Sequence, residues 1–144
     1  MVSCVLLKCH FGDVLFVSVY CKFNQPIQPY IDYLDRVLRY ARSIPCILGL
    51  DANASSPAWF SKTNRQTSGG LSFDRGQVLA DFMLMSGVSV LNVPSEHFTF
   101  DGPNGRSVLD LSICNNAALR FEISWKVRPN WSTSDHNIIE LNLK

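Results

Sequence analysis

Three short polar clusters follow or interrupt apolar runs, and together they could hydrolyse a phosphate ester. They are Gly49-Leu50-Asp51-Ala52-Asn53, Ser107-Val108-Leu109-Asp110 and Ser134-Asp135-His136. Strand ends are places where a rigid backbone presents side chains to a shared cleft. Three carboxylates, an amide and an imidazole suit metal-assisted attack of water on a phosphate. The sequence therefore predicts a hydrolytic centre, provided that the three clusters meet in space.

Each cluster also has a purely structural interpretation. Asp51 and Asn53 could form a turn after a strand, because Asp and Asn bond to their own backbone there. Residues 134–136 could be a local turn that holds a hydrogen-bonded histidine. Asp110 is harder to explain in this way, because it lies in an apolar run and a buried, unpaired carboxylate is unfavourable. We therefore expect Asp110 to have a partner or a metal ion.

The elements that carry these clusters can be placed from periodicity and turn signals. Apolar runs at residues 2–7 and 14–20 flank Gly12-Asp13 and predict two buried strands joined by a tight turn. Apolar positions repeat every three or four residues from Ile27 to Ala41, which predicts an amphipathic helix. Residues 46–50 form an apolar run that predicts a buried strand ending at Asp51.

The second half of the chain is predicted to be rich in strands. Residues 52–73 favour a long loop, of a length that is uncommon without a function. Asp74 could cap a second helix that ends at Gly87. The inner face of this helix is expected to carry Val78, Leu79, Phe82 and Met85. The further strands are expected at residues 88–93, 98–100, 107–113, 121–127 and 137–143, with turn residues at 101–105. Many strands and few helices favour an α+β fold of packed sheets with helices outside.

Composition limits the class of protein. The 144 residues suffice for one domain, and 47% apolar with 17% charged residues is typical of a globular chain. The net charge of +1 does not indicate a nucleic-acid binder, although Lys and Arg could gather on one face. No membrane span or signal peptide is expected. Five scattered cysteines without a CxxC pair favour free thiols, and hence an intracellular protein, nuclear or cytoplasmic.

The clusters, in their order along the chain, resemble the endonuclease/exonuclease/phosphatase family. Residues 47–54 (ILGLDANA) resemble its "GDxNA" signature, residues 107–111 (SVLDL) its "SxIDL" strand and residues 134–139 (SDHNII) its "SDHxxI" ending. Tyr20 falls where the family carries a phosphate-contacting tyrosine. The segment Ser56-Pro57-Ala58-Trp59, Asn92 and Thr99-Phe100 are further similar to the endonucleases of non-LTR retrotransposons of the R1/TRAS type. Leu50 departs from the signature, in which Gly directly precedes Asp.

The resemblance implies a DNase I-like fold, a four-layer α/β sandwich of two packed mixed β-sheets flanked by helices. Residues 1–144 would be the C-terminal portion of one such domain, because the family begins with further strands that carry an Asn and a metal-binding Glu. Without that Glu, the chain alone is expected to bind metal weakly and to nick DNA little or not at all, since Mg²⁺ uses few carboxylate ligands.

The resemblance also implies a role for each matched residue. Asp51 would orient and deprotonate the attacking water, and Asn53 would hold that water or a phosphate oxygen. His136 would stabilise charge on the phosphate, with Asp110 fixing its orientation. Asp135 and Asp51 would hold Mg²⁺, or Mn²⁺ in its place. The residues expected to contact substrate are Tyr20, Asn53, Trp59, Thr99 and Ser134.

The activity implied is that of a DNA endonuclease, which nicks target DNA and leaves a 3′-hydroxyl for reverse transcription. DNA and a reverse transcriptase domain downstream in the parent polyprotein are the implied partners. Three alternatives stay open: a phosphatase or lipid phosphodiesterase of the same superfamily, a catalytically dead remnant that binds DNA, and a β-rich interaction domain with accidental motif matches.

Basic side chains could guide DNA to such a site. Lys62, Arg65 and Arg75 could track a DNA backbone beside Trp59, although Trp59 could equally pack under its own loop. A second group could form a basic strip or merely a solvated surface: Arg106, Arg120, Lys126 and Arg128.

Overall fold

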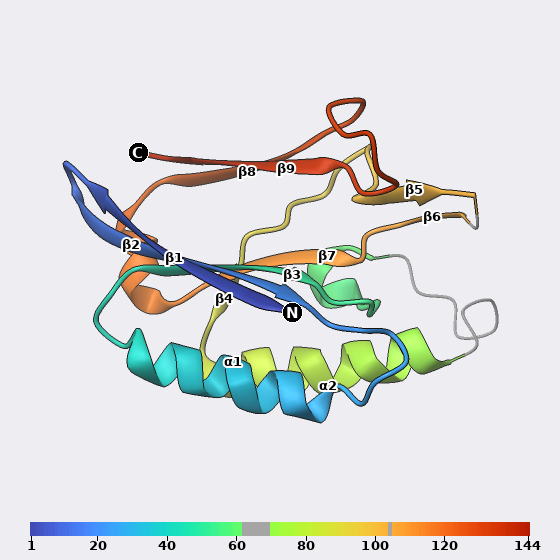
Figure 1. Cartoon of the computed structure of the whole chain (residues 1–144), viewed down its shortest axis with the longest axis horizontal. Coiled ribbons are helices and arrows are strands. Elements are labelled where there is room, and N and C mark those ends of the chain that lie inside the picture. The colour runs from blue at the N-terminus through green and yellow to red at the C-terminus, as the bar shows by residue number, and fades with distance from the viewer. Residues whose placement is uncertain (62–69, 104) are drawn as a thin grey trace.

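The computed structural model describes residues 1–61, 70–103 and 105–144, which form an α+β fold (Figure 1). In chain order the elements are β1 (Val2–Cys9), β2 (Gly12–Tyr20), α1 (Gln28–Tyr40), β3 (Cys46–Asp51), the 3-10 turn η1 (Pro57–Trp59), α2 (Leu71–Ser86), β4 (Ser89–Val90), β5 (Phe100–Gly102), β6 (Gly105–Ser107), β7 (Asp110–Cys114), the 3-10 turn η2 (Asn116–Arg120), β8 (Ile123–Arg128) and β9 (Ile138–Leu143). The predicted first hairpin, first helix and last two strands are confirmed to within two residues at each end.

The centre of the fold is a mixed sheet with the strand order β1-β2-β3-β7-β4. β2 and β3 run parallel, which requires a crossover connection, and α1 supplies it. The other neighbouring strands are antiparallel. The register brings three strand ends together, because Tyr20 lies beside Asp51 and Asp51 lies opposite Asp110. Two of the three polar clusters therefore meet at one end of this sheet.

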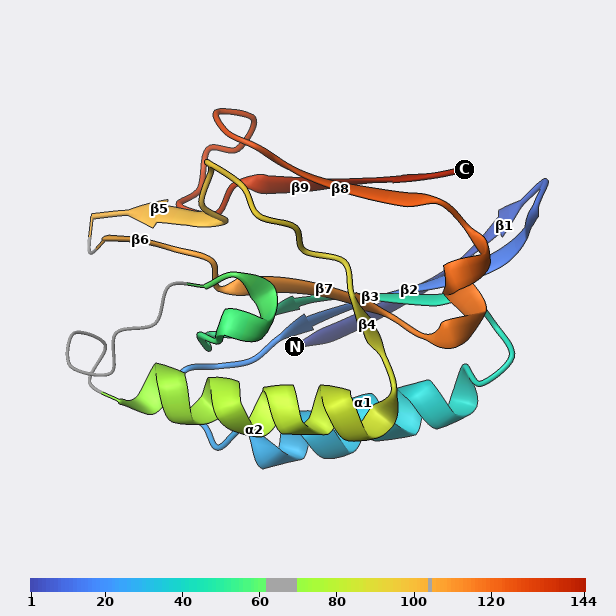
Figure 2. The same ribbon diagram turned by 180° about the vertical axis from the view of Figure 1, so that it is seen from behind.

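Three layers stack in the described part of the chain (Figures 1 and 2). α1 and α2 cover one face of the central sheet, and the antiparallel pairs β5–β6 and β8–β9 lie over the other. One apolar cluster lies under the helices, around Leu34 and Leu48, and a smaller one lies under β8–β9, around Val14 and Ile47. The α+β class is confirmed. The expected second mixed sheet and fourth layer are absent from the described residues, because β8 and β9 pair with each other alone and no described helix covers them.

The prediction that the first strand is buried is wrong, because most of β1 is exposed. Val5 is 53% exposed and Leu7 is 45% exposed, although both belong to the apolar run that predicted an interior strand. Among the described residues, β1 is the edge strand of the sheet and is paired along one side only, with β2. Apolar sequence predicted that this segment is a strand, but its position in the sheet depends on strand order, which local sequence does not encode.

The predicted inner face of the second helix is also partly wrong, because a different face of α2 packs against the core. The helix begins at Leu71 rather than at Asp74. Val78 and Met85, predicted to face the core, are exposed, whereas Leu79 is buried. The inward positions are Ser72, Gly76, Leu79 and Met83, at helical spacing. Gly76 sets this rotation, because a Cβ there would lie 1.9 Å from the carbonyl oxygen of Ser55. Neither α1 nor α2 is long and apolar enough to cross a bilayer.

Candidate active site

The candidate site forms where β3 ends, β7 begins and the chain enters β9. Asp51 is the last residue of β3 and Asp110 is the first of β7, and the two face each other across the antiparallel pair. His136 comes two residues before β9 and is held beside Phe100 by an isolated bridge. The third polar cluster thus joins the first two, although 85 residues of sequence separate Asp51 from His136.

The imidazole of His136 lies between the two carboxylates. Its Nδ1 is 3.1 Å and 3.0 Å from the two carboxylate oxygens of Asp110, and its Nε2 is 3.7 Å from Oδ2 of Asp51. One potential ligand atom from each of the three residues lies within 4.8 Å of the others. Tyr20 lines the same cavity, of about 430 Å³, together with these three residues. The structure therefore brings together one residue of each cluster, Asp51, Asp110 and His136.

Buried polar side chains fix the backbone at Asp110. The Thr99 hydroxyl accepts hydrogen bonds from the backbone N–H groups of Leu109 and Asp110, both at 3.1 Å. Asn92 donates to the Asp110 carbonyl at 3.0 Å and accepts from the Ser112 N–H at 2.8 Å. Thr99 is fully buried, so its predicted contact with substrate is wrong: it holds the strand that carries Asp110.

Electrostatics makes the two carboxylates an unfavourable pair. Burial raises the pKa of Asp51 above its ordinary value, and the nearby Asp110 raises it further, while His136 lowers it. Burial also raises the pKa of Asp110, against the hydrogen bond from Thr99 and the charge of His136. Two acids that resist ionisation together are stabilised in their charged form by a cation. The residues present thus suit a divalent cation that takes oxygen ligands.

Asp135 and Ser134 do not join this cluster. Asp135 is exposed, and its carboxylate lies against Gly102 of β5 rather than with the described group formed by Asp51, Asp110 and His136. The predicted metal pair of Asp135 and Asp51 stays a prediction, and Asp110 rather than Asp135 joins Asp51 in this group. The Ser134 hydroxyl accepts from the His136 N–H at 3.2 Å and donates to its carbonyl at 3.1 Å. Its hydrogen bonds order the turn that presents His136.

Asn53 lies just beyond Asp51, in a left-handed backbone conformation that Asn adopts more readily than other non-glycine residues. Its φ is 45°, in the left-handed region, and its side-chain amide donates to the Cys21 carbonyl at 3.0 Å. The Asn53 N–H donates to Oδ1 of Asp51 at 3.3 Å. The loop after β3 is therefore tied both to the end of β2 and to the carboxylate of Asp51.

Two side chains that could have contacted DNA are buried instead. Trp59 is 0% exposed, and its indole N–H donates to the Val108 carbonyl at 3.3 Å. Trp59 packs in the apolar cluster that lies under the helices. Arg75 is 4% exposed and bonds to backbone carbonyls. Lys62 and Arg65 lie outside the described residues.

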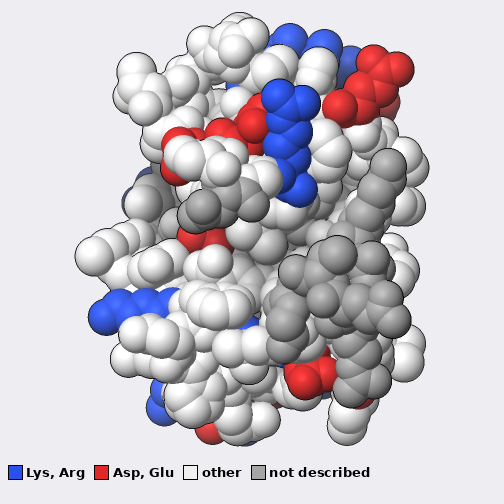
Figure 3. Space-filling view, turned by 90° about the vertical axis from the view of Figure 1, so that its right-hand side faces the viewer, with Lys and Arg blue, Asp and Glu red and all other residues white. Residues whose placement is uncertain are grey.

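The predicted second basic strip is interrupted by acids. Arg106 pairs with Asp101 at 2.9 Å, and Arg128 pairs with Glu140 through two hydrogen bonds. Arg120 lies at η2, where it stacks on Phe121. The face that contains the ends of β5 and β6 shows blue and red side chains next to one another rather than a continuous blue band (Figure 3). Within the described part of the chain, this surface is mixed in charge.

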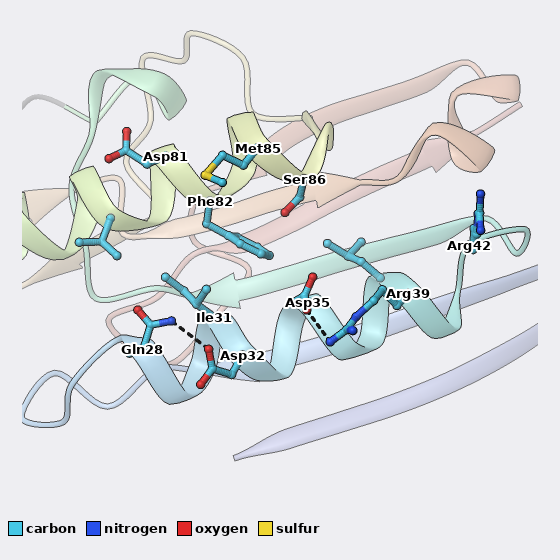
Figure 4. Close-up of a pocket in the computed structure, with 12 residues that line it drawn as sticks. Gln28, Ile31, Asp32, Asp35, Arg39, Arg42, Asp81, Phe82, Met85 and Ser86 are labelled. Carbon is cyan, nitrogen blue, oxygen red and sulfur yellow. Dashed lines mark hydrogen bonds and ion pairs between the residues drawn. The ribbon is translucent and has the colours of Figure 1, made fainter.

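A larger cavity, of about 750 Å³, lies elsewhere, between α1 and α2 (Figure 4). Its walls carry apolar side chains such as Ile31 and Phe82, and the pair Asp35–Arg39 at 2.6 Å. It lies on the helical side of the sheet and contains none of the three clustered residues. The smaller cavity at the strand ends is therefore the candidate active site, because it is lined by the two carboxylates and the imidazole that hydrolysis would use.

Known proteins resemble this chain in sequence. The endonuclease-reverse transcriptase family model matches residues 14–140. The chain is 42% identical over 137 residues to a 115 kDa protein of the type-1 retrotransposable element R1DM of Drosophila melanogaster. It is 41% identical over 140 residues to the Pol polyprotein of the type-1 element R1 of Bradysia coprophila. These alignments cover 94% and 97% of this chain but only 13% and 14% of the two relatives.

Solved structures resemble it in fold. The endonuclease domain of TRAS1, a telomere-specific non-LTR retrotransposon, superposes with a TM-score of 0.85 at 28% identity. The match covers 99% of this chain and 61% of that domain. An endonuclease/exonuclease/phosphatase family protein from Leptotrichia buccalis superposes with a TM-score of 0.62 at 16% identity, over 99% of this chain and 53% of that one. The second likeness concerns the fold alone.

Proposed function

We propose, from the premise that this chain belongs to the endonuclease-reverse transcriptase family, that it forms the water-activating part of a metal-dependent DNA endonuclease. Its product would be a nick with a 3′-hydroxyl that primes reverse transcription. The observation that carries this proposal is the placement of His136 between Asp51 and Asp110 at the ends of β3 and β7. This arrangement has a proton acceptor, a proton donor and an orienting acid within one cavity.

Each residue has a role that its contacts support. Asp51, whose pKa is raised by burial, accepts the proton of the attacking water. His136 donates to a non-bridging phosphate oxygen, where negative charge grows in the transition state. Asp110 holds the imidazole through Nδ1, so that Nε2 points into the cavity. Tyr20 and Asn53, from the two neighbouring strand ends, contact the phosphate and position the water.

The carboxylates of Asp51 and Asp110 would hold Mg²⁺ or Mn²⁺. When bound, such an ion neutralises charge on the phosphate and on the acid pair. Asp135 can assist through water or after substrate has bound, since its carboxylate lies apart from the cluster. Thr99, Asn92 and Ser134 hold Asp110 and His136 in place.

The complete enzyme would be larger than this chain. The chain spans about an eighth of the retrotransposon proteins and 61% of the TRAS1 endonuclease domain that it matches. We propose that residues 1–144 are one portion of a DNase I-like domain whose remaining strands complete the four-layer sandwich. A reverse transcriptase domain would lie downstream in the same polyprotein, as the Pol name of the Bradysia relative suggests.

A substrate panel tests this proposal. The test uses the domain completed with its remaining strands, because the chain alone is expected to nick little or not at all. This domain is incubated with Mg²⁺ and supercoiled plasmid, abasic duplex DNA or phosphoinositide, and the nick is extended with a polymerase to detect its 3′-hydroxyl. We expect plasmid nicking that is lost in Asp51→Asn and kept in Asp32→Asn, which removes an exposed acid of α1. Phosphate release from phosphoinositide without nicking would favour a phosphatase. Salt-sensitive DNA binding without any cleavage would favour a dead remnant. Either result would overturn the proposal.

A further inference from the structure

Arg75 is a buried arginine that bonds to the backbone of the site. Its guanidinium extends from α2 and donates from Nε to the Asn53 carbonyl at 3.2 Å and from Nη2 to the Ala52 carbonyl at 3.3 Å. A third donor, Nη1, bonds to the carbonyl of Gln25. Among the described residues, none of its hydrogen bonds goes to a carboxylate. Burying a guanidinium is unfavourable unless it is hydrogen-bonded, and these three bonds offset that cost.

The segments that Arg75 joins are those that carry the proposed site. Ala52 and Asn53 directly follow Asp51, and Gln25 lies in the connection after Tyr20. The two segments also bond to each other, because the Cys21 N–H donates to the Asp51 carbonyl at 2.9 Å and the Asn53 amide donates to the Cys21 carbonyl at 3.0 Å. One side chain of α2 thus spans the end of β2 and the end of β3.

The backbone at Asn53 lies in the left-handed region, with φ of 45°. Asn adopts this region more readily than other non-glycine residues, and the contacts around it select this conformation over the commoner ones. Arg75 bonds to the carbonyl of Asn53 itself. The next residue, Gly76, presses on the same loop, since only a residue without Cβ fits against Ser55. α2 therefore contacts the loop after β3 at consecutive positions.

We propose that Arg75 is a positioning residue, which fixes Asn53 and the end of β3 so that the side chains of Asn53 and Asp51 meet the phosphate and its attacking water. This inference deepens the proposed endonuclease function and rests on it. Arg75 itself touches no substrate, because it is 4% exposed. Its hydrogen bonds to this loop are to the backbone carbonyls of residues 52 and 53.

Two substitutions separate positioning from folding. Arg75→Met keeps the length of the side chain but removes its charge and donors, and Arg75→Lys keeps the charge and one donor group. Arg42→Met, at an exposed arginine after α1, is the matched control. Each variant is examined by thermal unfolding, by nicking kinetics with Mg²⁺ and by the ¹H–¹⁵N signals of the Asn53 side-chain amide, assigned with Asn53→Asp.

We expect Arg75→Met to lower kcat by roughly 100-fold with KM changed by less than about threefold, as for a misplacement near 1 Å. Arg75→Lys should recover part of kcat, the Asn53 amide signal should shift in both variants, and Arg42→Met should match the wild type. A folded Arg75→Met protein with wild-type kcat and an unshifted Asn53 signal would overturn the inference. If Arg75→Met does not fold, the kcat and Asn53 signal of Arg75→Lys decide in the same way.

The inference and the proposed function fail differently. If the wild-type protein nicks no DNA, the proposed function is lost, and the Asn53 amide alone decides whether Arg75 positions this loop. If the wild type nicks DNA and Arg75→Met nicks it equally well, the proposed function stands and the role of Arg75 is lost. An increase in KM without a change in kcat would also contradict positioning, because it indicates weakened ground-state binding.

Discussion

The centre and the edge of the sheet differ more in burial than in sequence. β1 reads VSCVLLKC and β3 reads CILGLD, and both are apolar strands. Leu48 of β3 is nevertheless 0% exposed, whereas Leu6 of β1 is 47% exposed. β3 has a strand on each side and a layer over each face, whereas β1 is the last strand of the sheet. Position in the sheet, rather than composition, decides what each strand contributes.

The candidate site follows the same division. Asp51 and Asp110 lie at the ends of β3 and β7, two strands inside the sheet, although β4 pairs only with Ile113 and Cys114 at the far end of β7. No proposed site residue lies on β1. A hydrolytic centre needs its groups held to within about 0.5 Å, which a strand paired on both sides provides better than an edge strand does. The comparison therefore predicts that function depends on the centre and tolerates change at the edge.

The largest effect on nicking is expected at His136, and His10, at the opposite end of the sheet, is its control. His136→Ala removes the proposed proton donor and should lower nicking by roughly 10²–10⁴-fold. His10→Ala, in the exposed turn between β1 and β2, should leave nicking and the melting temperature unchanged. Plasmid nicking at pH 7 measures both. Equal losses in the two variants would break the division between centre and edge.

Two leucines compare the strands as sources of stability. Leu111 of β7 is fully buried, so Leu111→Ala should lower the free energy of unfolding by about 3 kcal/mol, from lost transfer energy and a cavity. Leu7→Ala on β1 removes a half-exposed side chain and should lower it by less than about 1 kcal/mol. Urea unfolding followed by circular dichroism gives both values. A larger loss at residue 7 than at residue 111 would mean that β1 is covered in solution.

The cysteines report the same contrast through their reactivity. Burial raises the pKa of Cys114 on β7 to about 11 and that of Cys46 on β3 to about 12, from 9.0. Two pKa units lower the thiolate fraction about 100-fold, so both should react far more slowly with a disulfide reagent at pH 8 than Cys4 of β1, which is exposed. Peptide mapping of the labelled protein identifies the sites. Rapid labelling of Cys46 in the folded protein would contradict its burial.

The buried thiols of Cys46 and Cys114 also make the free energy of unfolding depend on pH above pH 9. They stay neutral in the fold and ionise in the unfolded chain above pH 9, so the unfolded state binds fewer protons there. The stability that these thiols contribute is therefore present below pH 9 and is lost as the pH rises toward 11.

The smallest effect concerns the acid pair itself. The pKa of Asp51 is raised, so the fold favours its neutral form, and the associated stability is present below the ordinary value of 3.8 and is lost as the pH rises. Without added metal, Asp51→Asn should therefore stabilise the protein slightly at pH 7, because it removes a charge that burial and Asp110 disfavour. The gain should shrink at pH 4, where the native carboxyl is partly protonated. A destabilised variant at pH 7 would show that the charged form of Asp51 is favoured.

The sequence predicted what depends on local pattern and on matched motifs. Strands, the first helix and the need of Asp110 for a partner followed from periodicity and from the unfavourable burial of a lone carboxylate. The meeting of Asp51, Asp110 and His136 followed from the motif order. Trp59, Thr99 and Arg75 were assigned to DNA, but they lie inside, because a side chain's burial depends on which distant segments cover it. Arg75 bonds to three carbonyls that no local pattern links to it.

Manganese binding tests most directly the claim that these strand ends form a cation site. Mn²⁺ added in small amounts to the ¹⁵N-labelled protein broadens the amide signals of residues near the bound ion. The account predicts that the signals of Asp51, Asp110 and His136 broaden first, while those of Asp32 and Asp35 on α1 stay sharp until much higher concentrations. Broadening that begins at the α1 acids, or that affects all exposed acids alike, would contradict it.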